Sequence, residues 1–391
     1  MKTATVTWIT YKNYGTVLQA YALQSFIKSL GIDNDIISDR KIIAEKYHKT
    51  EVESKVETEK RTWLKKQIDH IRHPLQYIWL HCLKLKQKRE KKQTSFYYRS
   101  QEKIKGFAEN RLSITEPVSR CDLPVLNNKY DLFIAGSDQI WSPLPINFDG
   151  YFFLDFVTKK KGSYAPSLGT LNIPEDKKEL IKGYVQNYSF CSVRENQSAE
   201  QFTEELEIPT EWVCDPTLLY DKVFWNNFCA DIKSKERKYV LCYFLENKDW
   251  YFEYAKQLSK YLGKKLLLIP NFLDFCLKKN FIKEIVGPVD FVFLIKNADF
   301  ILTDSYHGMI FSMIFEKQLI YLKRFDDAAP NCQNIRVYSL LDHLNLEKII
   351  VPEKNFAPSD VQQIDYKYVS QKLSSHRCKS CDFLKKNINE A

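Results

Sequence analysis

The residues best suited to chemistry lie in the segment Asp299–Met309, where an apolar run ends in polar side chains. Phe300–Thr303 predicts a strand, and α/β folds place their ligands at the carboxyl ends of such strands. The residues that follow include the substrate-binding candidates Asp304, Ser305 and Gly308, and His307 lies at the start of the next helix. An imidazole titrates at about pH 6.5 when unperturbed, which suits proton transfer at neutral pH. A lone histidine is more often structural, but this position favours a catalytic role for His307.

A second candidate, Arg194, directly follows the predicted strand Phe190–Val193. A guanidinium there could hold a carboxylate or a phosphate through paired hydrogen bonds. The alternative is a salt bridge to Glu195 or to another neighbour. Arg194 is therefore a candidate for binding an anionic substrate.

Three further turns place polar groups or glycines after predicted strands or before helices. Free N–H groups at a helix start favour an anion, and glycine lets backbone approach a ligand closely. Each turn also fits an ordinary capped turn in which a side chain satisfies backbone N–H groups. The binding candidates in these turns are Asn13, Gly15, Thr16, Gly136, Ser137, Asp138, Gln139 and Ser167.

Short apolar runs alternate with helical stretches, and this alternation predicts α/β domains with mainly parallel sheets. The predicted strands are 4–9, 34–38, 130–135, 162–164, 190–193, 239–244, 265–269, 300–303 and 318–322; the predicted helices are 17–30, 175–188, 198–205, 250–262, 288–297 and 309–315. We expect an N-terminal domain over 1–215, a C-terminal domain over 216–345 and a tail of modest helical content over 346–391. Such domains would bind a ligand in the cleft between them.

The positive charge of the chain is concentrated in one segment. The 391 residues carry a formal net charge of +9, yet residues 60–105 hold 14 Lys and Arg against three acidic residues, a net charge of +11. The remainder is therefore about −2. This segment predicts a basic helical insert in the N-terminal domain.

Within the insert, apolar residues at positions 64–85 recur at helical spacing, and Pro74 should kink the helix. One interpretation is a helix that packs its apolar stripe on the main fold. Another is an amphipathic basic helix resting on an anionic membrane surface. We expect no nucleic-acid partner, because no known binding module accompanies the charge.

Other patterns narrow the class of protein. Ten scattered cysteines and no evident export signal favour reduced thiols and a cytoplasmic location. No run of about 18 apolar residues predicts a membrane span. Cys378 and Cys381, with His376 nearby, are too few for a structural zinc site, so we expect surface thiols and no metal. Walker-type, G-x-S-x-G and H-E-x-x-H motifs do not occur.

Taken in order, six segments resemble the polysaccharide pyruvyl transferase family. They span roughly residues 5–325 outside the basic insert. Each segment alone is weak evidence for the family, but the six segments in this order are fairly specific for it. The segments are Asn13–Gln24, Gly136–Trp141, Tyr164–Gly169, Ser192–Glu195, Asp215–Leu219 and Thr303–Gly308.

The resemblance implies a GT-B-like fold of two Rossmann-like domains and transfer of a pyruvyl group from phosphoenolpyruvate to a sugar. It implies that Arg194 holds the donor and that His307 acts at the reacting centre. Characterised members carry an Arg where this chain has Ser305; Lys12, Lys323 or Arg324 could supply that cation instead.

We therefore expect a pyruvyl transferase that acts on a cell-surface glycan or its lipid-linked precursor. It would need no cofactor besides its donor substrate, and the basic insert could hold it at the inner face of the membrane. The alternatives are a GT-B glycosyltransferase that uses a nucleotide sugar and a non-catalytic binding protein of a glycan pathway.

Overall fold

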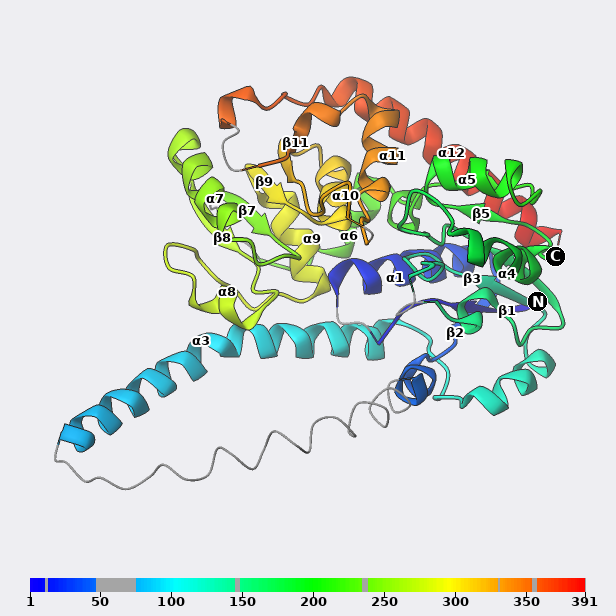
Figure 1. The fold of residues 1–391 in the computed structure, drawn as a ribbon, viewed down its shortest axis with the longest axis horizontal. Coiled ribbons are helices and arrows are strands. Elements are labelled where there is room, and N and C mark those ends of the chain that lie inside the picture. The colour runs from blue at the N-terminus through cyan, green and yellow to red at the C-terminus, as the bar shows by residue number, and fades with distance from the viewer. Residues whose placement is uncertain are drawn as a thin grey trace.

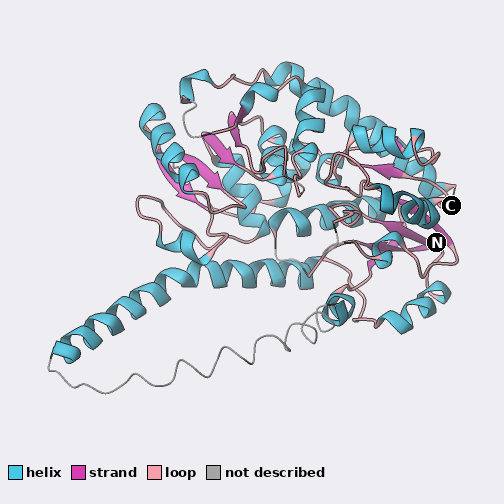
Figure 2. Ribbon diagram, viewed as in Figure 1, coloured by secondary structure: helices cyan, strands magenta, loops and turns pink. Residues whose placement is uncertain are grey.

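The computed structural model describes residues 1–10, 13–46, 75–144, 148–233, 238–329, 331–353 and 357–390, and of residues 75–92 only the backbone. Within these ranges, two parallel sheets and their covering helices form a body from which one long helix extends (Figures 1 and 2). The fold is α/β with two Rossmann-like parallel sheets, so the predicted fold class is confirmed.

The N-terminal sheet has the strand order β2-β1-β3-β4, and all its strands are parallel. Its strands are β1 (Lys2–Val6), β2 (Asp33–Ile36), β3 (Leu132–Ala135) and β4 (Lys160–Ser163). A short parallel pair follows, β5 (Ser192–Val193) with β6 (Glu211–Trp212), connected to β4 by a bridge between Gly162 and Phe190. Every residue of β3 is buried, as expected for a central strand covered on both faces.

The C-terminal sheet has the order β11-β10-β9-β7-β8 and is also parallel throughout. Its strands are β7 (Tyr239–Tyr243), β8 (Lys265–Leu268), β9 (Phe300–Thr303), β10 (Leu319–Leu322) and β11 (Ile350–Val351). Strand β9, which precedes the His307 segment, lies in the centre of this sheet and has the predicted bounds.

Helices cover both sheets and connect successive strands (Figure 2). They are α1 (Tyr14–Ser29), α3 (Leu75–Arg111), α4 (Glu175–Val185), α5 (Asn196–Glu204), α6 (Lys222–Phe228), α7 (Asp249–Leu262), α8 (Leu273–Leu277), α9 (Pro288–Asn297), α10 (Tyr306–Ile314), α11 (Ile335–Leu344) and α12 (Tyr366–Asn389). Short 3-10 helices are η2 (Arg120–Asn128), η3 (Gly150–Phe153), η4 (Pro216–Leu219), η5 (Glu347–Ile349) and η6 (Pro358–Asp360). None of the described helices is both long and apolar enough to cross a bilayer.

Helix α1 belongs to the N-terminal half but packs against the C-terminal half. The ring of Tyr14 stacks on Phe291 of α9 with centroids 4.9 Å apart, and its hydroxyl donates to the carbonyl of Val286 at 3.2 Å. Most residues of α1 are buried, because the helix lies between the two halves. Its N-terminus is therefore presented to the second sheet.

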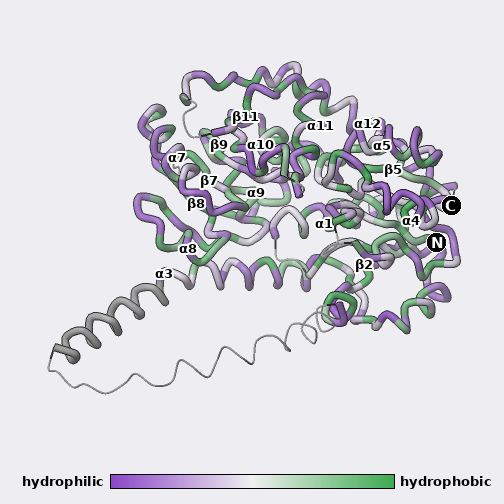
Figure 3. Tube along the Cα trace, viewed as in Figure 1, coloured by the Kyte–Doolittle hydropathy of each residue, from purple (hydrophilic) through white to green (hydrophobic). Residues whose placement is uncertain are grey.

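The C-terminal part of α3 is part of the body, whereas its N-terminal part extends away from it (Figure 1). Ile104, Phe107 and Ala108 are buried in the core, and Ser100 Oγ accepts the N–H of Val286 at 2.9 Å. Hydrophobic and hydrophilic residues alternate along this packed part (Figure 3). The predicted apolar stripe over 64–85 and the kink at Pro74 lie outside the residues whose side chains are described.

The C-terminal tail differs from its prediction, because α12 is a continuous helix of 24 residues. Its buried face includes His376 and Ser380 beside aliphatic residues, which weakens the apolar periodicity in the sequence. Ser380 Oγ accepts the N–H of Cys214 at 2.9 Å, and Phe383 contacts Phe190 edge to face. The last helix thus returns to pack on the N-terminal half.

Two predicted boundaries near the candidate site also shift. Strand β1 ends at Val6 rather than Ile9, and Thr7 donates its hydroxyl to the carbonyl of Ser137 at 2.8 Å. Helix α10 begins at Tyr306 rather than Met309, with Ser305 as its cap. His307 therefore lies inside the first turn of α10.

Candidate functional site

The turn before α1 and the turn after β3 meet at the carboxyl edge of the N-terminal sheet. Asn13 caps α1 by accepting the N–H of Gly15 at 2.8 Å. Thr16 donates its hydroxyl to Asp138 Oδ2 at 2.7 Å, and Asp138 has a left-handed φ of 74°. The structure therefore brings together binding candidates that are more than a hundred residues apart in the chain.

The neighbouring candidates Gly136, Ser137 and Ser167 surround this contact. Gly136 lies so close to Thr5 that an added methyl group would come within 2.9 Å of the threonine side chain. The backbone N–H of Ser167 donates to the carbonyl of Asp138 at 2.8 Å. These residues hold the turn of Asp138 in place by backbone contacts, and the side chains of both serines are buried.

Gln139 connects the two halves of the molecule. Its amide donates to Gln333 Oε1 at 3.0 Å, across a sequence separation of 194 residues. Gly169, with φ of +72°, allows this approach, because a methyl group there would lie 2.2 Å from Gln139 Nε2. This contact places the start of α11 beside the turn of Asp138.

The N-termini of α1 and α10 also meet between the two sheets. A methyl group on Gly15 would lie 2.0 Å from His307 Nδ1, so the imidazole occupies the space that a larger residue would fill. His307 is 6% exposed. The glycine of the first motif therefore allows the histidine of the last motif to approach α1.

His307 and Arg194 both face the carboxylate of Asp215. Arg194 Nη1 lies 2.7 Å and His307 Nε2 lies 3.4 Å from Asp215 Oδ2. The backbone N–H and the hydroxyl of Thr217 donate to Asp215 Oδ1 at 3.0 and 2.7 Å. His307 Nε2 itself has no hydrogen bond among the described residues. The predicted catalytic pair is thus connected through a shared carboxylate.

The electrostatics of this group keep Asp215 ionised. Burial alone would raise its pKa, but His307, Arg194 and the Thr217 hydroxyl outweigh burial and hold the pKa below its usual range. An ionised carboxylate beside an imidazole can orient the ring. The grouping can therefore support a histidine that gives and takes a proton.

Arg194 is enclosed on most sides. Its side chain is fully buried, its Nε lies 3.4 Å from Glu195 Oε1, and its guanidinium carbon lies 4.5 Å from the centre of the Tyr306 ring. Its remaining nitrogen, Nη2, is buried without a hydrogen bond among the described residues. Arg194 therefore makes the salt bridges expected of a structural arginine and also keeps an unused donor.

The residues that precede His307 shape the start of α10. Ser305 Oγ accepts the N–H of Gly308 at 3.3 Å, and Thr303 Oγ1 accepts the N–H of Ser305 at 3.1 Å. Asp304 Oδ1 accepts the N–H of Leu245 at 2.6 Å, while its Oδ2 is buried without a partner among the described residues. Burial, opposed by Arg324, raises the pKa of Asp304 to about 7.

Among the cations proposed to compensate for Ser305, two are already paired. Lys323 Nζ lies 2.5 Å from Asp327 Oδ2, and Arg324 Nε lies 3.2 Å from Glu246 Oε1. Lys12 lies outside the described residues. The structure adds Arg336, half-buried in the first turn of α11, at a position where the sequence suggested no element.

Sequence reasoning also missed Asp215 and Tyr306 as site residues. Asp215 follows β6, whose two residues are too short to show alternation, and it was assigned only to the domain boundary and the family pattern. An Asp-Pro pair directly after the apolar Val213-Cys214 was the available signal.

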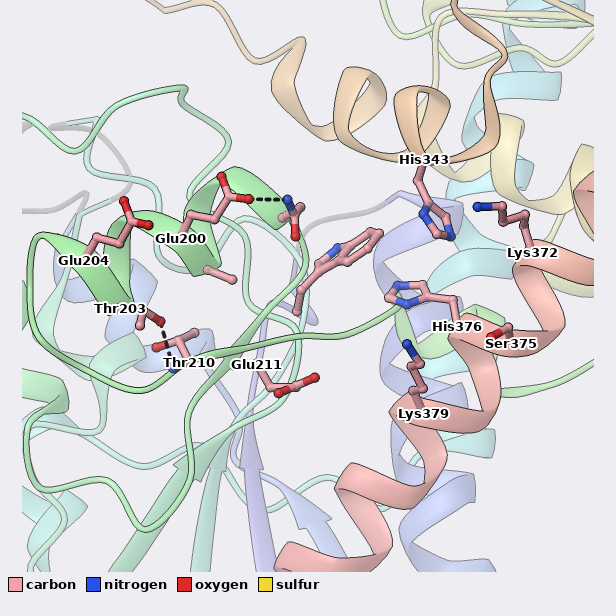
Figure 4. Close-up of a pocket in the computed structure, with 13 residues that line it drawn as sticks. Glu200, Thr203, Glu204, Thr210, Glu211, His343, Lys372, Ser375, His376 and Lys379 are labelled. Carbon is pink, nitrogen blue, oxygen red and sulfur yellow. Dashed lines mark hydrogen bonds between the residues drawn. The ribbon is translucent and has the colours of Figure 1, made fainter.

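A separate pocket of about 520 Å³ lies between α5, β6, α11 and α12 (Figure 4). Glu200, Glu204 and Glu211 line one side of it, and Lys372 and Lys379 line the other. His307 and Arg194 do not line this pocket, although Trp212 on its wall donates to the carbonyl of Arg194 at 3.1 Å.

No grouping of three or more metal-ligating side chains occurs among the described residues. Cys378 is exposed, Cys381 is half-buried, and both are free thiols on α12. His376 packs its ring against Trp212, with centroids 4.2 Å apart.

The solved structures to which this chain is similar have little sequence in common with it. A UDP-GlcNAc 2-epimerase from Methanocaldococcus jannaschii matches over 100% of both chains at 12% identity, with a TM-score of 0.54. A glycosyltransferase from Rickettsia africae matches over 99% of this chain and 97% of its own at 12% identity, with a TM-score of 0.46. No curated protein matches the sequence. The fold of the chain is GT-B-like.

The sequence family is established separately. The model of the polysaccharide pyruvyl transferase family matches residues 13–326, from the cap of α1 to the loop after β10. This range includes Gly15, Asp138, Arg194, Asp215 and His307, which the structure assembles between the two sheets. The chain is therefore a transferase and belongs to the polysaccharide pyruvyl transferase family.

Proposed function

We propose that this transferase moves a pyruvyl group from phosphoenolpyruvate to a sugar of a cell-surface glycan or its lipid-linked precursor, forming a ketal. The observation that carries the proposal is the buried group of His307, Asp215 and Arg194, located where the helix starts of both halves meet. This group lies within the part of the chain that matches the family.

The chemistry requires an acid and a stabilised anion. Protonation of the methylene carbon of phosphoenolpyruvate produces a methyl group and an oxocarbenium-like centre at the neighbouring carbon. One sugar hydroxyl attacks that carbon, inorganic phosphate leaves, and a second hydroxyl of the same sugar closes the ketal. No water is consumed, and the two hydroxyl protons balance the proton delivered and the protonation of the phosphate.

The residues of the site fit these steps. His307 is the proposed acid, and the ionised Asp215 would orient its ring. The starts of α1 and α10 present backbone N–H groups and positive macrodipole ends to an anionic donor. Arg194, held by Asp215 and Glu195, would add a fixed positive charge through Nη2, which has no hydrogen bond among the described residues.

We further propose that the basic insert holds the enzyme on an anionic membrane surface at the inner face of the membrane. Residues 60–105 carry +11, and the N-terminal part of α3 extends away from the body (Figure 1). Each basic residue near an anionic surface contributes about 1 kcal/mol of attraction. The insert would therefore bring the site to lipid-linked acceptors.

Phosphate release that depends on the acceptor tests the proposed reaction. The protein is incubated with phosphoenolpyruvate and a panel of lipid-linked glycans, and inorganic phosphate is measured with and without each acceptor. We expect release only when phosphoenolpyruvate and an acceptor are both present. Thermal stabilisation by nucleotide sugars but not by phosphoenolpyruvate would instead favour a glycosyltransferase.

A further inference from the structure

The pocket between α5, β6, α11 and α12 has walls of opposite charge (Figure 4). One wall carries the carboxylates of Glu200, Glu204 and Glu211, and the wall formed by α12 carries the ammonium groups of Lys372 and Lys379. None of these five side chains forms a salt bridge with another described residue. The charges of both walls are therefore available to a ligand between them.

His376 is the buried polar group of this pocket. It is 6% exposed and lines the pocket, and its ring points from α12 into the space between the walls (Figure 4). The ring packs on Trp212 but has no hydrogen bond among the described residues. Buried polar groups are almost always hydrogen-bonded, and each exception requires an explanation. The imidazole therefore indicates a ligand with hydrogen-bonding groups.

The imidazole of His376 is neutral at physiological pH. Burial, and then the neighbouring His343 and Lys379, lower the pKa of His376 to about 4. A neutral imidazole offers one hydrogen-bond donor and one acceptor. The pocket thus combines carboxylates that only accept hydrogen bonds, ammonium groups that only donate them, and a ring that does both.

These groups favour a neutral ligand with several hydroxyls. A hydroxyl can donate to a carboxylate and can also accept from an ammonium group, whereas a singly charged ligand would be repelled by one of the two walls. The volume of about 520 Å³ suits a small organic molecule rather than a single ion. The ring of Trp212, which also lines the pocket, offers an aromatic surface for the apolar C–H groups of a sugar.

We propose that this pocket binds a neutral saccharide through its two charged walls and His376. The pocket is separate from the candidate site, because neither Arg194 nor His307 lines it. The two are neighbours, however: α5 begins at Asn196, and Trp212 Nε1 donates to the carbonyl of Arg194 at 3.1 Å.

For the proposed reaction, the pocket would hold a part of the acceptor glycan away from the reacting hydroxyls. Binding at two points raises the effective concentration of the acceptor at the second point. This role in the reaction rests on the proposed function, whereas the binding of a saccharide does not.

Two substitutions on opposite walls test the class of ligand. Titrations of maltose, lactose, cellobiose and N,N′-diacetylchitobiose, followed by NMR signals of the sugar, are made on the full chain and on Glu204→Gln and Lys379→Gln. Both side chains are exposed, and equal melting temperatures show that the variants are folded. The control is Lys386→Gln, an exposed lysine of α12 that does not line the pocket.

We expect at least one of the disaccharides to bind, and both Glu204→Gln and Lys379→Gln to weaken it by about 3- to 10-fold. This is the effect of replacing a charged hydrogen-bonding partner by a neutral one. Lys386→Gln should bind like the unaltered protein. His376→Phe, which keeps a ring but removes its nitrogens, should show a similar loss; if it fails to fold, the two exposed positions still decide the test.

Opposite effects of the two substitutions would contradict a neutral ligand. An anion would bind more tightly when Glu204 is neutralised, and a cation would bind more tightly when Lys379 is neutralised. Binding of none of the four disaccharides, or equal affinity in every variant, would also overturn the inference.

Measurements of product formation separate this inference from the proposed function. In an active enzyme, Glu204→Gln and Lys379→Gln should raise the KM for the acceptor glycan and leave kcat unchanged. Disaccharide binding with the expected pattern, but without product from phosphoenolpyruvate, would support the pocket and remove the proposed function. Product formation by a protein that binds none of the disaccharides would overturn the inference alone.

Discussion

At the scale of single residues, one carboxylate connects the two side chains that the sequence identified separately. Asp215 accepts from Arg194 at 2.7 Å and lies 3.4 Å from His307. Arg194 and His307 each follow a predicted strand of a parallel sheet, so the sequence predicts that both side chains lie at the carboxyl edges of the sheets. Their common partner could not be predicted, because it depends on how the two halves pack.

His307→Ala tests the proposed acid. We expect a loss of about 10²- to 10⁴-fold in turnover, the usual contribution of a positioned proton donor, with a cooperative unfolding transition retained. The control is His343→Ala, which removes a half-buried imidazole of α11 outside the proposed site. Near-full phosphate release by the His307 variant would remove this residue from the mechanism.

Asp215→Asn tests the buried ion pair. The substitution leaves the charge of Arg194 buried opposite a neutral amide, which should lower the free energy of unfolding by about 3–5 kcal/mol. Asp221→Asn, at the exposed cap of α6, should cost about 1 kcal/mol or less. Urea unfolding measures both, and equal costs would contradict the assignment of a buried pair.

Asp304 predicts a dependence of stability on pH. Its pKa is about 7 in the folded chain against an ordinary value of 3.8, so between these values only the folded chain keeps the proton. The contribution of Asp304 to the free energy of unfolding therefore falls as the pH rises from about 4 to 7. The free energy of unfolding of Asp304→Asn, taken relative to that of the unaltered protein, should therefore rise by roughly 2 kcal/mol or more from pH 5 to pH 8. Urea unfolding at both pH values measures this gain, and no gain would contradict the raised pKa.

At the scale of elements, the close contact between α1 and α10 makes glycine necessary at position 15. Gly15→Ala would place a methyl group 2.0 Å from His307 Nδ1 and displace the imidazole. A displacement of about 1 Å can cost 10²-fold in rate, so we expect a loss of that order.

The matched control for that substitution is Gly183→Ala. Gly183 is exposed on α4, and a methyl group there would meet nothing within 4 Å. Because alanine favours a helix more than glycine does, the control should gain about 0.5–1 kcal/mol of stability and keep its activity. Equal activities of the two variants would contradict the contact between Gly15 and His307.

The elements that the sequence predicted well are those with long apolar runs. Strand β9 and helix α9 have the predicted bounds, because both are buried and end at clear polar boundaries. The strands β6 and β11 have two residues each, too few to show a period. Helix α11, which carries Arg336, was missed because the polar Ser339 lies on its buried face and interrupts the apolar periodicity.

At the scale of the whole molecule, the net positive charge of the chain belongs to residues 60–105, a segment that includes the part of α3 that extends away from the body. Lys103 pairs with Asp290, and Ile104 and Phe107 are buried, so the end of α3 cannot be removed without damaging the core. The basic residues earlier in the helix can be neutralised instead. They are Lys84, Lys86, Lys88, Arg89, Lys91 and Lys92.

Neutralising these six residues to glutamine tests the proposed membrane contact. We expect the unaltered protein to sediment with anionic vesicles at low salt and to dissociate as the salt concentration rises. The variant should lose this binding. The control neutralises six exposed lysines elsewhere, Lys41, Lys129, Lys159, Lys233, Lys256 and Lys260, and should keep it. Equal loss in both variants would indicate an unspecific effect of net charge.

The most direct test of the central claim is the mass of the product formed from phosphoenolpyruvate and a lipid-linked glycan in heavy water. The proposed reaction predicts a glycan heavier by one pyruvyl ketal whose methyl group carries one deuterium from the solvent, together with an equal amount of inorganic phosphate. An unmodified glycan under these conditions, with sugar transfer from a nucleotide sugar instead, would contradict pyruvyl transfer by this protein.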